Sequence, residues 1–179
     1  MPSIGLVRYG AVPEVARCEL LEGVQPVRGS ALVVETHRGP MLATLLEIAR
    51  PPVEPGQQLA PAQFHMLRIA TDEDQQESAR LREQALANCN DWEQRIRDWD
   101  VDLQLLDCEF TLDGSKQILY VLNDRGPDCT KLAIQAAAKG LGIIEVQPVG
   151  SEGLISQPVS DGGGGCGSGG GCGSGGCGH

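Results

Sequence analysis

Apolar and polar residues alternate most clearly in the stretch 101–150, which predicts the order strand, turn, strand, helix, strand. Within 106–112 every second residue is apolar, the period of a half-buried strand, and Glu109 and Thr111 fall on its polar side. The segment 113–116 predicts a tight turn, because its glycine tolerates a positive φ and its aspartate can bond to the turn backbone. The strands on either side of this turn are therefore expected to form a hairpin.

The second half of this stretch predicts a helix between two strands of one sheet. Residues 117–123 are rich in β-branched and aromatic side chains and form the returning strand of the hairpin. Asp128 is expected to cap a helix that ends at Gly140. The apolar face of this helix consists of Leu132, Ala133, Ala136 and Ala137. Residues 142–149 predict a third strand, so one helix should cover a sheet of three strands.

Residues 1–50 predict a small β-module. Its strands are expected at 4–9, 15–20, 31–36 and 41–48, with turn residues between them. Short strands at near-regular spacing favour a small barrel or a curled sheet. The arginines of this module are expected on solvated strand faces; they are Arg8, Arg17 and Arg38.

A proline-rich segment, 51–70, is predicted to link this module to a long helix. The apolar residues between 64 and 69 are expected to add a short strand or a docking segment. The helix is predicted over 72–99, with Thr71 as its cap. Its apolar stripe consists of Leu81, Ala85, Cys89, Trp92, Ile96 and Trp99. The cysteine of this stripe is expected to be a small core residue. The two tryptophans are expected to anchor the helix on the sheet, with contact to a partner as the alternative.

The chain of 179 residues carries a net charge of −10 that is unevenly distributed. Residues 1–68 contain six glutamates and six arginines, whereas residues 71–161 contain 18 acidic and eight basic residues, a balance of −10. An acidic second half argues against contact with a nucleic-acid backbone, which leaves an arginine patch on the first half as the alternative. No apolar run approaches the ~20 residues of a membrane span, and the first residues lack a signal segment. A cytoplasmic protein is therefore expected.

Glycine makes up 12 of the 18 residues from 162 to 179, so this segment alone is expected to be a disordered tail. The tail also carries a tetrahedral ligand set for zinc: Cys166, Cys172, Cys177 and His179. Thiolates suit iron–sulfur clusters as well. The ligands are spaced more loosely than in ordinary zinc knuckles, so an unliganded tail is the alternative to metal capture.

Two motifs stand out: DLQLLDCEFTLDGSKQILYVLND at 102–124, followed by a predicted helix, and GSALVVETHRG at 29–39. Together and in this order they resemble the polymerase-suppressor (PSP) C-terminal domain family, in particular its bacterial YaaT (RicT) members. The likeness spans about residues 1–155. The residues that match the family pattern in its C-terminal part are Cys89, Phe110, Thr111, Leu112, Asp113, Ser115, Lys116, Tyr120, Asp128, Leu132, Ile144, Gln147 and Gly150.

The resemblance implies a non-catalytic accessory protein that acts with protein partners in a small complex. Members of the YaaT type assist an endoribonuclease in maturing transcripts, and their complex carries iron–sulfur clusters. The family's Cys-Gly-x-x-Leu-Cys-Cys run is absent here, and the Gly/Ser/Cys tail stands in its place. The family's Arg-Val-Asp-Phe-Arg-Glu-Leu segment corresponds to residues 126–132, so partner contacts there are expected to differ.

These observations predict an α+β protein with a barrel-like β-module (1–50), a linker (51–70), a PSP-type α/β domain (71–155) and a Gly/Ser/Cys-rich tail (156–179). The function expected is that of a regulatory adaptor rather than an enzyme, because the sequence shows no phosphate loop and no nucleophile–histidine pair. The partner surface is expected to consist of Arg38, Asp113, Ser115, Lys116, Asp128 and Lys131. The alternatives are metal or iron–sulfur binding and redox sensing through the tail, and nucleic-acid binding by the β-module.

Overall fold

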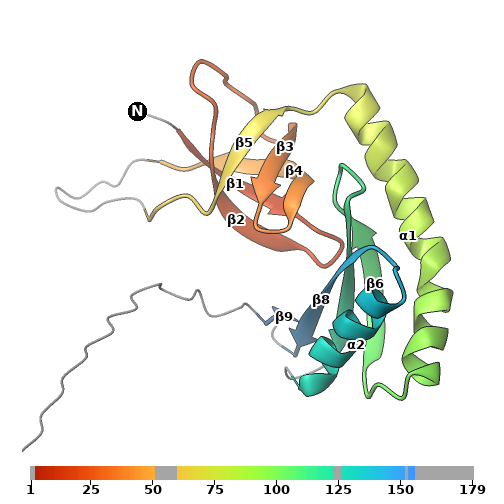
Figure 1. Cartoon of the computed structure of the whole chain (residues 1–179). Helices are drawn as coiled ribbons and strands as arrows, with labels where there is room; N and C mark the ends of the chain where they lie inside the picture. Colours follow the sequence, from red (N-terminus) through yellow and green to blue (C-terminus); the bar gives the residue numbers. More distant parts are fainter. Residues whose placement is uncertain (1–2, 51–59, 123–125, 152, 156–179) are drawn as a thin grey trace, which may run out of the picture.

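The computed structural model describes residues 3–50, 60–122, 126–151 and 153–155. It consists of a closed β-barrel and a four-stranded sheet, and a long helix, α1 (Asp72–Asp98), runs from the barrel along the sheet (Figure 1). The α+β class and the order of these parts confirm the prediction from the sequence.

The barrel closes in the strand order β1-β2-β5-β3-β4. Its strands are β1 (Ile4–Tyr9), β2 (Glu14–Glu19), β3 (Ala31–Thr36), β4 (Gly39–Ile48) and β5 (Phe64–Ile69). β5 pairs with β2 in parallel and with β3 in antiparallel orientation, so it fills the gap between them. Of the two interpretations offered for 64–69, the strand is confirmed, and closure leaves the barrel without an exposed edge.

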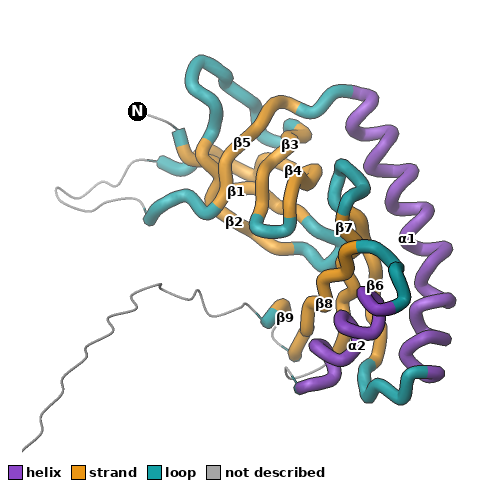
Figure 2. Tube along the Cα trace, viewed as in Figure 1, coloured by secondary structure: helices purple, strands orange, loops and turns teal. Residues whose placement is uncertain are grey.

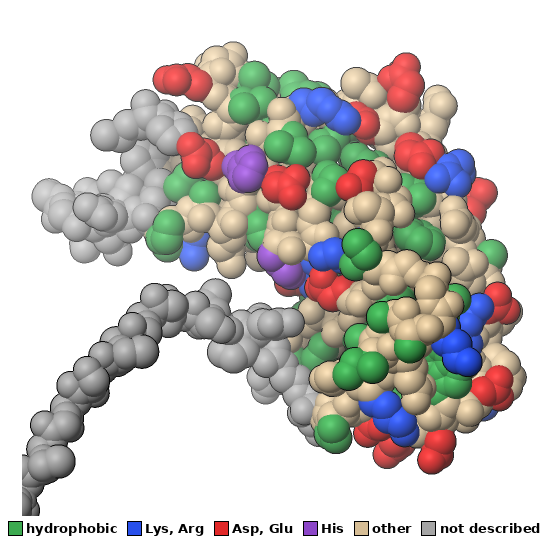
Figure 3. All heavy atoms as spheres, viewed as in Figure 1, with side chains coloured by type: hydrophobic (Ala, Val, Ile, Leu, Met, Phe, Trp, Pro, Cys, Tyr) green, Lys and Arg blue, Asp and Glu red, His purple; other side chains and the backbone are tan. Residues whose placement is uncertain are grey.

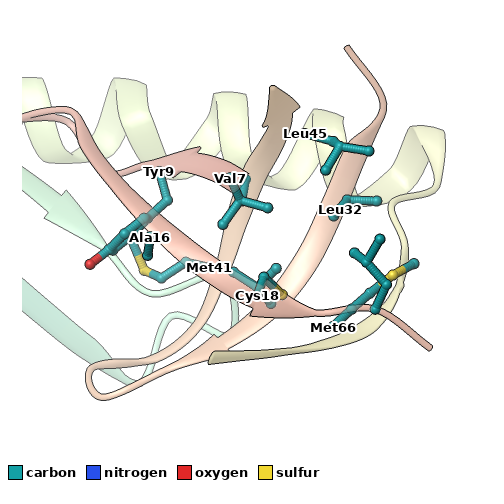
Figure 4. Packing of buried hydrophobic residues seen from close by; sticks show 11 residues of the cluster. Val7, Tyr9, Ala16, Cys18, Leu32, Met41, Leu45 and Met66 are labelled. Atoms are coloured by element: carbon teal, nitrogen blue, oxygen red, sulfur yellow. The ribbon is translucent and has the colours of Figure 1, made fainter. Parts of the chain in front are cut away.

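Alternation along the strands places one side of each strand inside the barrel (Figure 4). The interior is filled by Val7, Tyr9, Ala16, Cys18, Leu20, Leu32, Val34, Met41, Ala43, Leu45 and Met66. Aliphatic side chains dominate this core because aromatic residues make up only 3% of the chain. The barrel is thus a packed support rather than a container for a ligand.

Helix α1 begins and ends close to its predicted limits. Thr71 and Asp74 form a capping box in which the hydroxyl of Thr71 accepts from the Asp74 N–H. Trp92 is buried, and its indole N–H donates to Gln117 Oε1 (3.1 Å), so it anchors the helix on the sheet as predicted. Cys89 packs against the same core but is partly exposed. In the described part of the chain, neither helix combines the length and the apolar surface that crossing a bilayer requires.

The sheet has the strand order β6-β7-β8-β9. Its strands are β6 (Gln104–Phe110), β7 (Lys116–Leu122), β8 (Ile143–Gly150) and β9 (Gly153–Leu154). β6 and β7 form the predicted hairpin, and α2 (Pro127–Ala138) connects β7 to the parallel strand β8. Both helices pack on one face of the sheet, where they share a core with Leu119. β9 is a fourth strand that the sequence pattern did not predict.

The N-terminus of α2 differs from the prediction. Gly126 is the N-cap and makes no side-chain cap bond, whereas Asp128 lies within the first turn. Pro127 fixes the start instead, because its missing N–H is not needed there and its φ is already helical. The cap assigned to Asp128 is therefore wrong, although the helix dipole still favours a carboxylate at this position.

The second face of the sheet is buried as well, because the barrel covers it. Ile118 and Tyr120 are fully buried on this face, beside Ala11 and Val12 of the β1–β2 turn. Thr111 is fully buried and Glu109 is 8% exposed, so the expectation of a solvated polar side for this strand is wrong. A bulge at 105–107 also shifts the register of β6, which leaves Leu106 exposed.

Candidate functional site at the junction of barrel and sheet

Arg38 is the central residue of the contact between barrel and sheet. It lies in the β3–β4 turn, where its N–H donates to Thr36 Oγ1 (3.1 Å). Gly39 follows with a φ of 121°, a conformation that side chains disfavour, and a Cβ added there would lie 3.4 Å from Thr111 Cγ2. The turn therefore packs closely against the end of β6 and directs the arginine into the junction.

The side chain of Arg38 is 1% exposed, and its guanidinium is surrounded by groups from both parts of the molecule. From the barrel, Glu14 Oε1 lies 2.8 Å from Nη2. From the sheet, Nη1 donates to the hydroxyl of Tyr120 (3.2 Å), and Glu145 Oε1 lies 3.4 Å from Nε. The rings of Tyr9 and Tyr120 lie 5.9 and 5.7 Å from the guanidinium carbon. The expectation that Arg38 is solvated is wrong, because the sheet covers this end of the barrel.

Glu109 makes the second polar connection across the junction. Its carboxylate accepts hydrogen bonds from the hydroxyl of Tyr120 and from the backbone N–H of Ala11 (2.7 Å). Gly10 precedes this contact with a φ of +84°, and a Cβ there would lie 3.3 Å from the Tyr120 hydroxyl oxygen. Arg38, Tyr120, Glu109 and the β1–β2 turn thus form one chain of hydrogen bonds that crosses between barrel and sheet twice. Figure 3 shows a histidine beside basic and acidic side chains along this junction.

Burial governs the protonation of this cluster. Removal from water raises the pKa of Glu109, although its hydrogen bonds and the charge of Arg38 favour the ionised form. Burial, together with the carboxylate of Glu109, also raises the pKa of Tyr120 far above its ordinary value. Burial alone would lower the pKa of Arg38, but Tyr120 and Glu14 reverse the direction and raise it. The tyrosine therefore stays a proton donor and the arginine stays charged.

A small cleft of about 220 Å³ opens beside this cluster. Its lining comes from the barrel, from α1 and from β6, and consists of Gly10, Ala11, Met41, Leu42, Ser78, Leu81, Arg82, Glu109, Phe110 and Leu112. The two charged residues in the lining already have partners within the chain. Arg82 donates to both carboxylate oxygens of Asp107 (2.7 and 2.8 Å) and to the carbonyl of Cys108 (2.8 Å). The polar groups here hold the elements together.

Three residues of the predicted partner surface lie at the β6–β7 turn, which Figure 2 shows beside α1. The carboxylate of Asp113 accepts from the Thr111 hydroxyl (2.6 Å) and from the N–H and hydroxyl of Ser115 (3.0 and 2.9 Å). Burial opposes ionisation, but these hydrogen bonds outweigh it and lower the pKa of Asp113. Lys116 pairs with Glu145 (3.1 Å). Asp113 and Ser115 remain exposed at the tip.

The other two predicted residues of the sheet unit lie at its opposite end. Asp128 and Lys131 belong to the first turns of α2, and the ammonium of Lys131 donates to the carbonyl of Asp100. β7 (Lys116–Leu122) separates them from the hairpin tip, a length of roughly 20 Å at the usual rise per residue. The structure thus divides the predicted partner surface between two ends of the sheet and buries Arg38.

The predicted metal ligands of the tail, Cys166, Cys172, Cys177 and His179, lie outside the described residues. Metal capture by the tail therefore stays a prediction. Within the part of the chain that the structure describes, no three His, Cys, Asp or Glu side chains lie close enough together to hold a metal ion.

Residues 65–137 match the family model of the PSP1 C-terminal conserved region. We refer to this part of the chain as the PSP1 region. It runs from β5 to the last turn of α2, so it combines the strand that closes the barrel with α1, the hairpin and α2. Neither the curated proteins nor the solved structures contain a match. This match suggests a non-catalytic, regulatory role, and the assignment to the YaaT type stays a prediction.

Sequence reasoning did not identify Glu109 as a functional residue, and it included Tyr120 only as a match to the family pattern. A glutamate at an alternating position of a strand has the same pattern whether it faces water or a second domain. The available signal was the unbroken apolar run of β7, because strands that are covered on both faces lose their alternation. In the PSP1 region this run reveals that something covers the second face, but not that the barrel does.

Proposed function

We propose that the chain is a non-catalytic adaptor of the YaaT type, which binds protein partners in a small complex such as one that matures RNA with an endoribonuclease. The observation that carries this proposal is the chain of hydrogen bonds through Arg38, Tyr120 and Glu109 that joins the barrel to the sheet. Groups that would suit acid–base chemistry are bonded to each other across the junction. They fix the relative position of two surfaces, which is what a scaffold requires.

The exposed ends of the PSP1 region supply the binding surfaces in this proposal. At one end, the hairpin tip presents Asp113 and Ser115 on a turn that is held rigid by its own hydrogen bonds. At the other end, Lys131 presents an exposed positive charge on α2. Rigid surfaces lose little conformational entropy on binding, so each contact contributes more to affinity.

Affinity purification of the full chain from its native cells tests the proposal. The extract is treated with ribonuclease so that proteins bridged only by RNA are removed, and co-purifying proteins are quantified by mass spectrometry. The wild-type chain is expected to retain a defined set of partners that includes an endoribonuclease. Recovery of no specific partner would contradict the adaptor function, and partners without a ribonuclease would contradict only the RNA-maturation part.

A matched pair of variants on α2 tests the binding surface. Lys131→Glu reverses a charge on the first half of the helix, and Lys139→Glu makes the same change at its C-cap. Lys131→Glu is expected to reduce partner recovery on the order of tenfold, the effect of about 1.4 kcal/mol, whereas Lys139→Glu should retain it. Equal recovery with the two variants would show that this end of the PSP1 region is not the binding surface.

A further inference from the structure

Two cysteines from different elements of the PSP1 region face each other. Cys89 of α1 and Cys108 of β6 bring their sulfur atoms to 3.2 Å, and both are thiols in this structure. A disulfide bond is about 2.05 Å long, so the sulfurs are roughly 1 Å beyond bonding distance. We propose that Cys89 and Cys108 are a redox-active pair that forms a reversible disulfide between helix and sheet.

The surrounding hydrogen bonds hold the two cysteines in register. Arg82 lies two turns before Cys89 on α1 and donates to the carbonyl oxygen of Cys108 (2.8 Å). Asp107, which also binds this arginine, accepts from the N–H of Cys108 (2.7 Å). The backbone of Cys108 is thus fixed to α1 from two directions. We expect the sulfur atoms to meet by side-chain rotation, because these hydrogen bonds hold the strand in place.

The exposure of the two thiols differs and sets the order of the reaction. Cys108 is fully buried, whereas Cys89 is partly exposed and can meet a small oxidant. Burial raises the pKa of Cys108, and the positive charge of Arg82 partly offsets this effect. Cys89 is therefore the residue that reacts first, and Cys108 is the resolving thiol.

The oxidant in this proposal is a low-molecular-weight disulfide. The thiolate of Cys89 attacks one sulfur of that disulfide, forms a mixed disulfide and expels a small thiolate, which takes up the proton that Cys89 gave up and leaves as the first small thiol. The sulfur of Cys108 then attacks Cys89 Sγ, and its proton goes to the second small thiolate that is expelled, which leaves as a thiol. In total, two protein thiols become one protein disulfide, and the small disulfide is reduced to two thiols.

Cys18 provides an internal comparison. It is also fully buried, but it lies inside the barrel core, and burial raises its pKa to about 11. The barrel core contains no other cysteine to pair with it. A buried thiol alone is thus not the basis of the proposal; the basis is the short distance between two thiols on separate elements.

Peptide mapping of the full chain tests the pair directly. Trypsin places the two cysteines in separate peptides, 83–95 and 98–116, each with a single cysteine. The folded protein is incubated in mixtures of oxidised and reduced glutathione, remaining thiols are blocked with N-ethylmaleimide, and the digest is analysed without reduction. The expected product is the two peptides linked, with two hydrogens fewer than their sum, and dithiothreitol should abolish it.

Two variants make the result decisive. A chain in which Cys166, Cys172 and Cys177 are serine should still give the linked peptide, which shows that the tail is not required. Cys89→Ser should not give the linked peptide. Oxidation is expected to raise the thermal midpoint of unfolding of the wild type but to leave that of Cys89→Ser unchanged. Recovery of the two peptides separately, both alkylated, from protein that keeps its native circular dichroism would overturn the proposal. Linkage only after denaturation would overturn it as well.

Discussion

At the scale of single residues, the molecule depends on a few polar side chains in an unusual position. Arg38, Tyr120 and Glu109 are buried between two apolar cores, where an unpaired polar group would be costly. Arg38 donates to Tyr120, and Glu109 accepts from the N–H of Ala11, and these two bonds form only when barrel and sheet are docked. Polar groups of this kind favour one docked arrangement of barrel and sheet, because other arrangements would leave them without hydrogen-bond partners.

Replacement of Arg38 by alanine is the first prediction. The change removes the buried guanidinium from between Glu14, Tyr120 and Glu145 and takes one partner from each of these groups. It is expected to lower the free energy of unfolding by roughly 2–4 kcal/mol, measured by urea denaturation. Arg50→Ala is the matched control, because Arg50 is 88% exposed and its ion pair with Glu47 should contribute less than about 1 kcal/mol. Equal effects of the two variants would contradict a structural role for Arg38.

The second prediction concerns pH and Glu109. Burial raises the pKa of this carboxyl in the folded state, whereas an unfolded glutamate ionises near about 4.3. Between these two pKa values the folded state binds more protons than the unfolded state. The contribution of Glu109 to stability is therefore complete below the unfolded pKa and is lost as the pH rises through the folded pKa.

Glu109→Gln tests this dependence, because glutamine keeps an acceptor for Tyr120 but cannot ionise. The free energy of unfolding of wild type minus that of the variant is expected to decrease from pH 4 towards neutral pH. Glu22→Gln, in an exposed part of the barrel, controls for the loss of a carboxylate. If the free energies of unfolding of wild type and Glu109→Gln changed in parallel over this pH range, the result would be inconsistent with a raised pKa of Glu109.

At the scale of secondary structure, the elements with strong local signals were predicted well. The capping box at Thr71 and the apolar stripe define α1, and the glycine of the 113–116 turn defines the hairpin. These features are local, because their hydrogen bonds join residues close in sequence. The sequence did not decide between a strand and a docking segment for β5, because its partners, β2 and β3, lie some thirty or more residues earlier in the chain.

The junction was missed for the same physical reason. Glu109 and Arg38 are 71 positions apart in sequence, and they meet through Tyr120 on a third element. Periodicity indicates that a face is polar, but it does not indicate whether water or another domain covers that face. The arginine of a turn between two strands has an ordinary pattern, and its burial depends on the docking of the whole sheet.

Thr71→Ala is the third prediction, at the start of α1. The variant loses the hydroxyl that accepts from the Asp74 N–H and should lower the free energy of unfolding by about 1 kcal/mol. Thr71→Ser keeps the hydroxyl and is expected to remain within a few tenths of the wild type. Thermal and urea denaturation measure both variants. If alanine and serine at this position had the same stability, the cap would not contribute to the helix.

At the scale of the whole molecule, barrel and sheet behave as one body in this account. The barrel covers one face of the sheet and the helices cover the other, so β7 is buried from Gln117 to Val121. The PSP1 region itself begins in β5, inside the barrel, so the family boundary does not coincide with a division between two independent units. An adaptor of this construction presents its surfaces at fixed relative positions.

Native-state hydrogen exchange tests this central claim most directly. Amides of β3 and β4 in the barrel and of β7 in the sheet are followed by mass spectrometry at increasing, sub-denaturing urea concentrations. In the wild type, the slowest amides of both parts are expected to exchange through one common opening, with the same free energy of opening. In Arg38→Ala, the free energies of opening of barrel and sheet are expected to differ. A wild-type barrel that opens at a clearly lower free energy than the sheet, unchanged by Arg38→Ala, would contradict this claim.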